Sequence, residues 1–166
     1  GGLCGSRDDN AYHVVTGSNT DTTAILEGFI VTGGQADRLD NLEQGKGAGM
    51  YVVSGSPTIR ACVFRYNDAI AVGGGMYIRD GSPSITDSVF ESNRATVFEP
   101  EGAGSGGGLY LTNGSPLITG CTFVRNLVWA FGGGLESYDA SPTIINCSIT
   151  DNAGGGIRLS RGRPLV

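Results

Sequence analysis

The sequence predicts an all-β fold: a single-stranded right-handed parallel β-helix (β-solenoid) of about 5–6 coils, with three short strands per coil. Two observations predict it. A unit that runs from Ser-Pro to Asn recurs over 56–67, 82–93, 115–126 and 141–152. A triplet of small residues recurs beside these units, at 47–49, 73–75, 106–108, 132–134 and 154–156. A fixed period of this length is typical of repeat architectures.

The aligned prolines set the period. Their successive spacings are 26, 33 and 26 residues, for Pro57, Pro83, Pro116 and Pro142. The seven extra residues before the third unit (33 − 26) are therefore one insertion. We expect an N-terminal lead-in segment over 1–22 and β-helix repeats over 23–166, with loop insertions near 37–46 and 99–105.

Each unit predicts strands rather than helices. Gly and Pro recur about every dozen residues, too often for helices of ordinary length. In segments such as 50–53 and 76–79 the first and third residues are apolar, which is typical of half-buried strands. Because the sequence offers no crossover helices, each strand is expected to pair with its equivalent one coil later.

That pairing sets equivalent residues about 4.8 Å apart, in columns along the axis. Three inward columns are expected: Met50, Met76, Leu109, Leu135 and Ile157; Ile59, Ile85, Ile118 and Ile144; and Ile30, Phe64, Phe90, Phe123 and Ile149. A fourth column is expected at the bend after the third strand: Asn67, Asn93, Asn126 and Asn152. An amide both donates and accepts, so these side chains can bond along the axis. The glycine triplets permit positive φ and close backbone approach at a corner.

Composition limits the functional classes. The net charge of −5 argues against nucleic acid as a partner, because its binding needs a basic surface. No stretch approaches the roughly 18 consecutive apolar residues of a membrane-spanning helix. Gly and Pro are frequent, but they recur at fixed offsets between apolar segments, which argues against disorder.

Residues 23–34, Thr-Ala-Ile-Leu-Glu-Gly-Phe-Ile-Val-Thr-Gly-Gly, precede copies of Gly-Gly-Gly-Met-Tyr, Gly-Ser-Pro-Ser-Ile-Thr and Val-Phe-Glu-Ser-Asn. This pattern resembles right-handed parallel β-helix repeat proteins of bacterial surfaces, whose fold is similar to the pectate-lyase-like superfamily. The resemblance covers residues 11 to about 160. It implies the fold and an extracellular or cell-surface location, as part of a larger secreted or anchored protein. It implies no particular reaction.

The outward columns offer little for catalysis. None unites two carboxylates on adjacent coils beside a Lys, Arg or His, so we expect no catalytic residue, metal site or cofactor, and lean against an enzyme. His13 is interpreted as a surface or cap residue, and Lys46 as a solvated loop residue. The acids of the insertions predict a solvated acidic rim, with calcium binding as the alternative: Asp37, Asp40, Glu43, Glu99 and Glu101.

One outward column is aromatic. Tyr51, Tyr77 and Tyr110 share it, and Tyr138 lies on the neighbouring column of the next coil. An exposed tyrosine strip suits sugar rings and contacts with another protein chain, although ordinary packing between coils also accounts for it.

The cysteines occupy an inward position. Cys62, Cys121 and Cys147 are equivalent, and Ser88 takes the same place in the remaining repeat. Cys121 and Cys147 fall on adjacent coils, close enough for a disulfide.

Two functional hypotheses follow. The first is an extracellular structural or adhesive module that associates end to end into a filament, or with neighbouring segments of a larger surface protein, because terminal coils present unpaired strand edges. Opposite charges at the two ends favour it: Arg158, Arg161 and Arg163 against Asp8, Asp9 and Asp21. The alternative is a carbohydrate-binding or polysaccharide-lyase-like domain that binds glycans through the tyrosine column.

Overall fold

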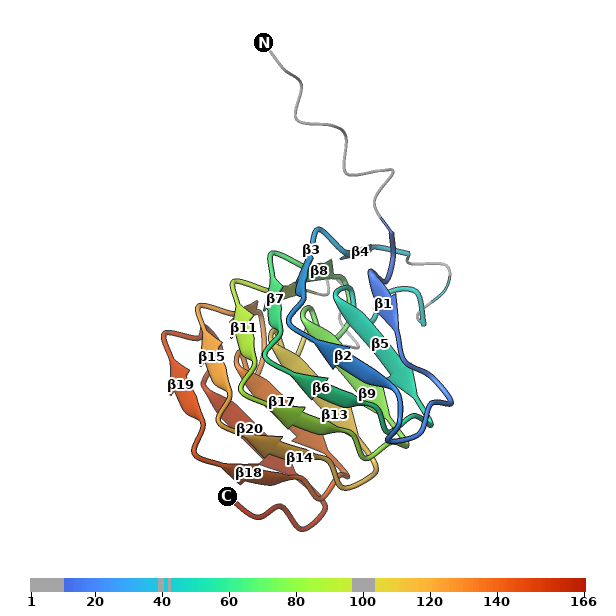
Figure 1. Cartoon of the computed structure of the whole chain (residues 1–166). Helices are drawn as coiled ribbons and strands as arrows, with labels where there is room; N and C mark the ends of the chain where they lie inside the picture. Colours follow the sequence, from blue (N-terminus) through green and yellow to red (C-terminus); the bar gives the residue numbers. More distant parts are fainter. Residues whose placement is uncertain (1–10, 39–40, 42, 97–103) are drawn as a thin grey trace.

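The chain winds into a parallel β-solenoid of about six coils in the computed structural model, which describes residues 11–38, 41, 43–96 and 104–166 (Figure 1). The described residues form strands, turns and bends but no helix. Every strand pairs in parallel with its equivalent one coil away, so four sheets run along the stack. The predicted parallel β-helix is confirmed.

The first sheet has six strands: β1 (Val15–Thr16), β5 (Met50–Val53), β9 (Met76–Arg79), β13 (Leu109–Thr112), β17 (Leu135–Tyr138) and β20 (Ile157–Ser160). The second has five: β2 (Ile25–Glu27), β6 (Thr58–Arg60), β10 (Ser84–Thr86), β14 (Leu117–Thr119) and β18 (Thr143–Ile145). The third also has five: β3 (Ile30–Thr32), β7 (Val63–Arg65), β11 (Val89–Glu91), β15 (Thr122–Val124) and β19 (Ser148–Thr150).

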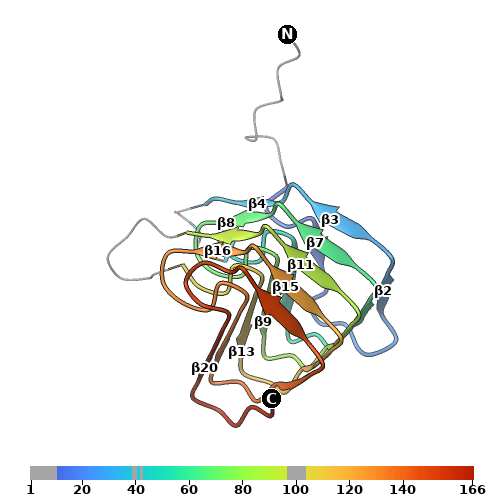
Figure 2. The same ribbon diagram turned by 90° about the vertical axis from the view of Figure 1, so that its left-hand side faces the viewer.

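A fourth sheet was not predicted. Its strands are β4 (Gln35–Ala36), β8 (Asp68–Ala69), β12 (Arg94–Ala95) and β16 (Leu127–Val128). It forms the remaining side of the coil in the view along the stack (Figure 2). Each strand has two residues, too few to show an alternating pattern, which explains why the sequence indicated only three strands per coil.

The first sheet begins inside the lead-in segment. Val15 pairs with Met50, and Thr16 pairs with Tyr51. Val15 also packs against the apolar core. Residues just before the repeats therefore already belong to the stack. No helix that could cross a membrane occurs in the part of the chain that the structure describes.

The interior consists of the expected columns with one correction. Met50, Met76, Leu109 and Leu135 are buried in one column, and the buried isoleucines form a second. The inward position predicted for Ile30 is wrong: Ile30 pairs with Val63 and is 58% exposed, whereas Val31 pairs with Phe64 and is 2% exposed. Adjacent residues of a strand face opposite sides, so a shift of one position exchanges core for solvent.

The phenylalanine column is a continuous stack of rings. The centroids of Phe64 and Phe90 lie 5.0 Å apart and those of Phe90 and Phe123 lie 4.8 Å apart, with ring planes 9° and 7° from parallel. All three side chains are fully buried. The coil spacing sets the ring spacing, so the stack follows directly from in-register pairing.

The asparagine column is a buried hydrogen-bond ladder. Nδ2 of Asn67 donates to Oδ1 of Asn93 at 3.0 Å and to the backbone oxygen of Val31 at 3.0 Å. The same pattern repeats on the next coils, where Asn126 Nδ2 donates to Asn152 Oδ1 at 3.0 Å. Asn67, Asn93 and Asn126 therefore tie their own coil to both neighbours, and Asn152, the last asparagine of the column, ties its coil to the coil before it.

Glycine is required where the chain turns into the first sheet. Gly73 has φ +67°, and a Cβ there would lie 2.4 Å from the backbone oxygen of Met76. Gly75 has no positive φ, but a Cβ would lie 2.4 Å from the backbone oxygen of Gly108 on the next coil. The triplet thus serves both the turn and the close approach of adjacent coils.

Candidate functional site: the outer face of the first sheet

Stacked rings run along the outer face of the first sheet. The centroids of Tyr51 and Tyr77 lie 5.5 Å apart, and those of Tyr77 and Tyr110 lie 5.9 Å apart. His13 extends the stack, with its ring 4.6 Å from that of Tyr51. Tyr138 pairs with Thr112, so it lies one column away, as expected from the sequence.

The middle of this stack is covered. Tyr77 is 3% exposed and Tyr138 is 36% exposed, while Tyr51 and Tyr110 are half-buried. Nζ of Lys46 lies 5.3 Å from the centroid of the Tyr77 ring. Tyr77 faces outward as expected but is not exposed, because a loop from the preceding coil packs over it.

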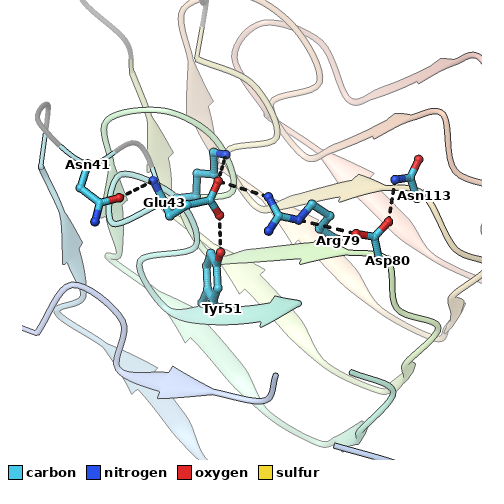
Figure 3. A network of polar contacts seen from close by, with 7 residues as sticks. Asn41, Glu43, Tyr51, Arg79, Asp80 and Asn113 are labelled. Atoms are coloured by element: carbon cyan, nitrogen blue, oxygen red, sulfur yellow. Dashed lines mark hydrogen bonds and ion pairs between the residues drawn. The ribbon is translucent and has the colours of Figure 1, made fainter. Parts of the chain in front are cut away.

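Glu43 fastens that loop to the sheet (Figure 3). Its carboxylate accepts a hydrogen bond from the hydroxyl of Tyr51 and lies 2.7 Å from Nζ of Lys46. Nη1 of Arg79 lies 3.2 Å away on the neighbouring coil. The backbone N–H of Glu43 donates to Oδ1 of Asn41 at 3.1 Å, which shapes the turn.

The electrostatics of this cluster favour an ionised carboxylate. Partial burial alone raises the pKa of Glu43, but the hydrogen bonds from Lys46 and Tyr51 and the charges of Lys46 and Arg79 outweigh it, and the pKa falls to about 2. Burial and the adjacent Glu43 carboxylate raise the pKa of Tyr51 well above its ordinary value. Tyr51 therefore remains a neutral hydrogen-bond donor to a charged acceptor.

Two loop interpretations need correction. Lys46 is not a solvated residue, since 20% of its side chain is exposed and it contacts both Glu43 and Tyr77. Glu43 is not part of a free acidic rim, because Tyr51, Lys46 and Arg79 all bind it.

The remaining acids of the predicted rim, and His13, differ in where the structure places them. Asp37 accepts a hydrogen bond from Nε2 of Gln35 at 2.8 Å. Asp40, Glu99 and Glu101 lie outside the described residues. His13 is half-buried at the end of the tyrosine stack, in keeping with the cap alternative rather than the surface one. This desolvation lowers its pKa, although contacts with the backbone of Gly47 and Lys46 oppose the shift.

Beyond Tyr110 the column changes chemistry. Glu136 takes the outward position, pairs in register with Tyr110 and is 3% exposed. Its Oε1 lies 3.3 Å from Nη1 of Arg158, while its buried Oε2 has no hydrogen-bond partner among the described residues. Burial raises the pKa of Glu136, against the opposing effects of a Ser105 hydrogen bond and Arg158. In the sequence, one Glu after three tyrosines in the same column gave no indication that its side chain would be buried.

Two arginines lie against aromatic rings next to Glu136. The guanidinium of Arg158 lies 4.1 Å from the centroid of Phe131, and that of Arg161 lies 5.1 Å from the centroid of Tyr138. Phe131 is 51% exposed. This end of the face therefore combines accessible aromatic surface with positive charge.

The cysteines remain separate. Cys62, Cys121 and Cys147 are free thiols, so the structure does not join Cys121 to Cys147. The thiol of Cys121 is directed to the backbone oxygen of Ile85, 3.6 Å from Sγ, and burial raises its pKa to about 12. These inward thiols act as small core side chains.

The described residues contain no cluster of three or more His, Cys, Asp or Glu side chains placed as metal ligands. No protein-family model matches the chain, and no curated protein or solved structure matches it either. The fold and this face define a parallel β-solenoid repeat protein.

Proposed function

We propose that the chain is an extracellular structural or adhesive module that associates end to end. The observation that carries this proposal is that the two ends of one inward column are alike: Val15 occupies the first coil and Ile157 the last, and both are only partly buried against the core. The strands that hold them, β1 and β20, are the two edges of the six-stranded sheet.

Pairing β20 of one copy with β1 of another continues both the hydrogen bonds and the apolar column. Leu159 is 36% exposed and Ile157 is partly buried on the last strand of the first sheet, so the added coil would cover apolar surface. An edge strand with unpaired backbone groups can template the addition of a further strand, here one from a second copy with the same fold. Neighbouring coils of a larger surface protein would occupy the same edges, in keeping with the resemblance to pectate-lyase-like repeat proteins of bacterial surfaces.

Sedimentation velocity and electron microscopy of the purified chain test the proposal. Over a rising concentration series we expect particles of constant width and increasing length. Strictly monomeric particles at the highest concentration would overturn it.

A glycan-binding function is the second candidate. It is favoured by Tyr138, which is 36% exposed beside Arg161, and by Phe131, which is 51% exposed. Exposed rings pack against the apolar faces of sugars. A glycan array, followed by a lyase assay with calcium, tests this function. Glycan binding that is lost in Tyr138→Ala but kept in Tyr77→Phe would support this function. No binding on the array and no lyase activity would rule it out.

A further inference from the structure

One column on the outside of the stack has oppositely charged ends. The backbone N–H of Ser82 donates to Oγ of Ser56 at 3.1 Å, and that of Ser115 donates to Oγ of Ser82 at 2.9 Å. The last bond of this kind runs from the backbone N–H of Arg163 to Oγ of Ser141, at 3.0 Å. Arg163, which is exposed, therefore occupies the serine position on the last coil.

The first coil places an acid at the same position. The backbone N–H of Ser141 donates to the oxygen of Gly114, the residue before Ser115. In the same way, the N–H of Ser56 donates to the oxygen of Thr20, the residue before Asp21. Asp21 is thus the counterpart of Ser56, as Ser115 is of Ser141, and it is exposed.

We propose that the partner at these ends is a second copy of this chain, seated so that Arg163 of one copy forms an ion pair with Asp21 of the next. The proposal rests on the end-to-end association proposed above and adds its register. Continuing the first sheet sets β1 of the second copy on β20, with Val15 on Ile157. The serine column then continues from Arg163 to Asp21, about 4.8 Å away between backbones.

The neighbouring corner column fits the same arrangement. It consists of residues with left-handed backbone, and its two ends are Asn19, with φ 57°, and Arg161, with φ 56°. Stacking the second copy in register sets Asn19 beside Arg161. A neutral amide there accepts a hydrogen bond from the guanidinium, so no like charges meet at this corner.

Asp21 is prepared for this contact. Its Oδ1 accepts hydrogen bonds from the backbone N–H and the hydroxyl of Thr23, at 2.9 and 2.6 Å. These bonds hold the carboxylate in one orientation and lower its pKa. Oδ2 remains available to a guanidinium. In this interface the apolar columns supply affinity, and the exposed ion pair selects the register.

The ends of the stack are stepped in a compatible way. At the C-terminal end, Leu165 forms a bridge to Thr143 on the second sheet, whereas the outermost strand of the third sheet is β19, one layer lower. At the N-terminal end, the oxygen of Ala11 accepts a hydrogen bond from the backbone N–H of Gln35, one layer outside β4. The outermost strand of the fourth sheet at the C-terminal end is β16, so the second copy extends by Ala11 on a sheet where the first copy also stops short.

Charge reversal tests the register. Sedimentation velocity in low and high salt would compare the unchanged chain with Asp21→Arg, Arg163→Asp and the double variant. Each single variant should associate about fivefold more weakly at low salt, and the double variant should recover. Asp87→Arg is the matched control, because Asp87 is exposed on a middle coil and its reversal should leave association unchanged.

A cross-link supplies a second measurement. Cysteines at positions 21 and 163 of adjacent copies would fall within disulfide reach. In a Cys4→Ser background, the Asp21→Cys, Arg163→Cys double variant should form covalent multimers on oxidation, whereas either single variant should form no species larger than a dimer. If the chain associates but neither the charge reversals nor the cysteine pair changes that association as expected, the proposed register is wrong and end-to-end association still stands. If the chain never associates, both proposals are wrong.

Discussion

Asn93 and Asn126 are joined twice across adjacent coils: the backbone N–H and Nδ2 of Asn93 both donate to Oδ1 of Asn126, at 3.0 and 3.1 Å. Nδ2 of Asn93 also donates to the backbone oxygen of Phe64 at 2.8 Å. Both amides are completely buried. A buried polar ladder of this kind stabilises only if every member is satisfied.

Replacing Asn93 should therefore be costly. Asn93→Ala removes the acceptor of the backbone N–H and of one Nδ2 bond of Asn67, and it removes the side-chain donor to the oxygen of Phe64, all in the interior. We expect a loss of about 3 kcal/mol in the free energy of unfolding, measured by urea denaturation. Asn113→Ala, at an exposed corner, should lose less than half as much. Equal losses would show that the ladder has no special role.

The phenylalanine stack should be equally sensitive. Phe90 contacts a ring on each side, so Phe90→Ala opens a cavity in the middle of the column. We expect a loss of about 3–5 kcal/mol, measured in the same way. Phe131→Ala removes a ring that is 51% exposed and should change stability by about 0.5 kcal/mol or less. A small loss for Phe90→Ala would contradict the packing described above.

Glu43 should stabilise its loop in a pH-dependent manner. Its pKa falls from 4.5 to about 2 in the folded chain. The stabilisation is therefore fully present above the ordinary pKa and is lost as the pH falls towards the folded value. At neutral pH, Glu43→Gln should lower the free energy of unfolding by about 1 kcal/mol, since the group is partly exposed. The difference from the unchanged chain should vanish in strong acid.

The solvent accessibility of Tyr77 tests whether Glu43 acts by holding the loop over the tyrosines. Loosening the loop should expose Tyr77, and quenching of tyrosine fluorescence by iodide should increase in Glu43→Gln. Glu27→Gln is a suitable control, because Glu27 pairs with Arg60 on the second sheet, whereas the tyrosine stack lies on the first. Equal quenching in the two variants would contradict the fastening role of Glu43.

Glu136 should show the opposite pH dependence. Burial raises its pKa, so the folded state binds the proton more tightly than the unfolded state. Stability from this group therefore increases as the pH falls through the raised pKa and decreases as the pH rises. Glu136→Gln should remove this dependence and, at neutral pH, raise the free energy of unfolding by about 1 kcal/mol. Urea denaturation between acid and neutral pH measures it, and a variant that loses stability at neutral pH would contradict the prediction.

Periodicity explains why most of the fold could be predicted. Residues 26 apart, such as Phe64 and Phe90, carry the same side chain because they occupy the same place in successive coils. The failure at Ile30 has a physical cause: Ile30 and Val31 are both apolar, so composition could not decide which faces inward. In the structure Val31 is buried and Ile30 is exposed, so Val31 is the residue that faces inward.

The site was harder to predict than the fold. The tyrosine column follows from the repeat, but its cover does not, since Glu43 and Lys46 belong to an insertion without a counterpart in the next coil. Their contacts with Tyr51 and Tyr77 depend on the path of a loop, which no period encodes. Glu136 was missed for a related reason: its burial comes from Arg158 and neighbouring loops rather than from its own strand.

The place of the longer loops has a consequence for how such a protein can change. The 37–46 insertion connects β4 to β5, and the 99–105 insertion lies between β12 and β13. Extra residues at this one junction leave the hydrogen-bonded amides and stacked rings undisturbed, because the rings lie on the third sheet and the amides on the bend that follows it, both before the junction. The molecule can therefore acquire new surface chemistry beside its tyrosines by lengthening a single side of a coil, while the spiral beneath keeps its pitch.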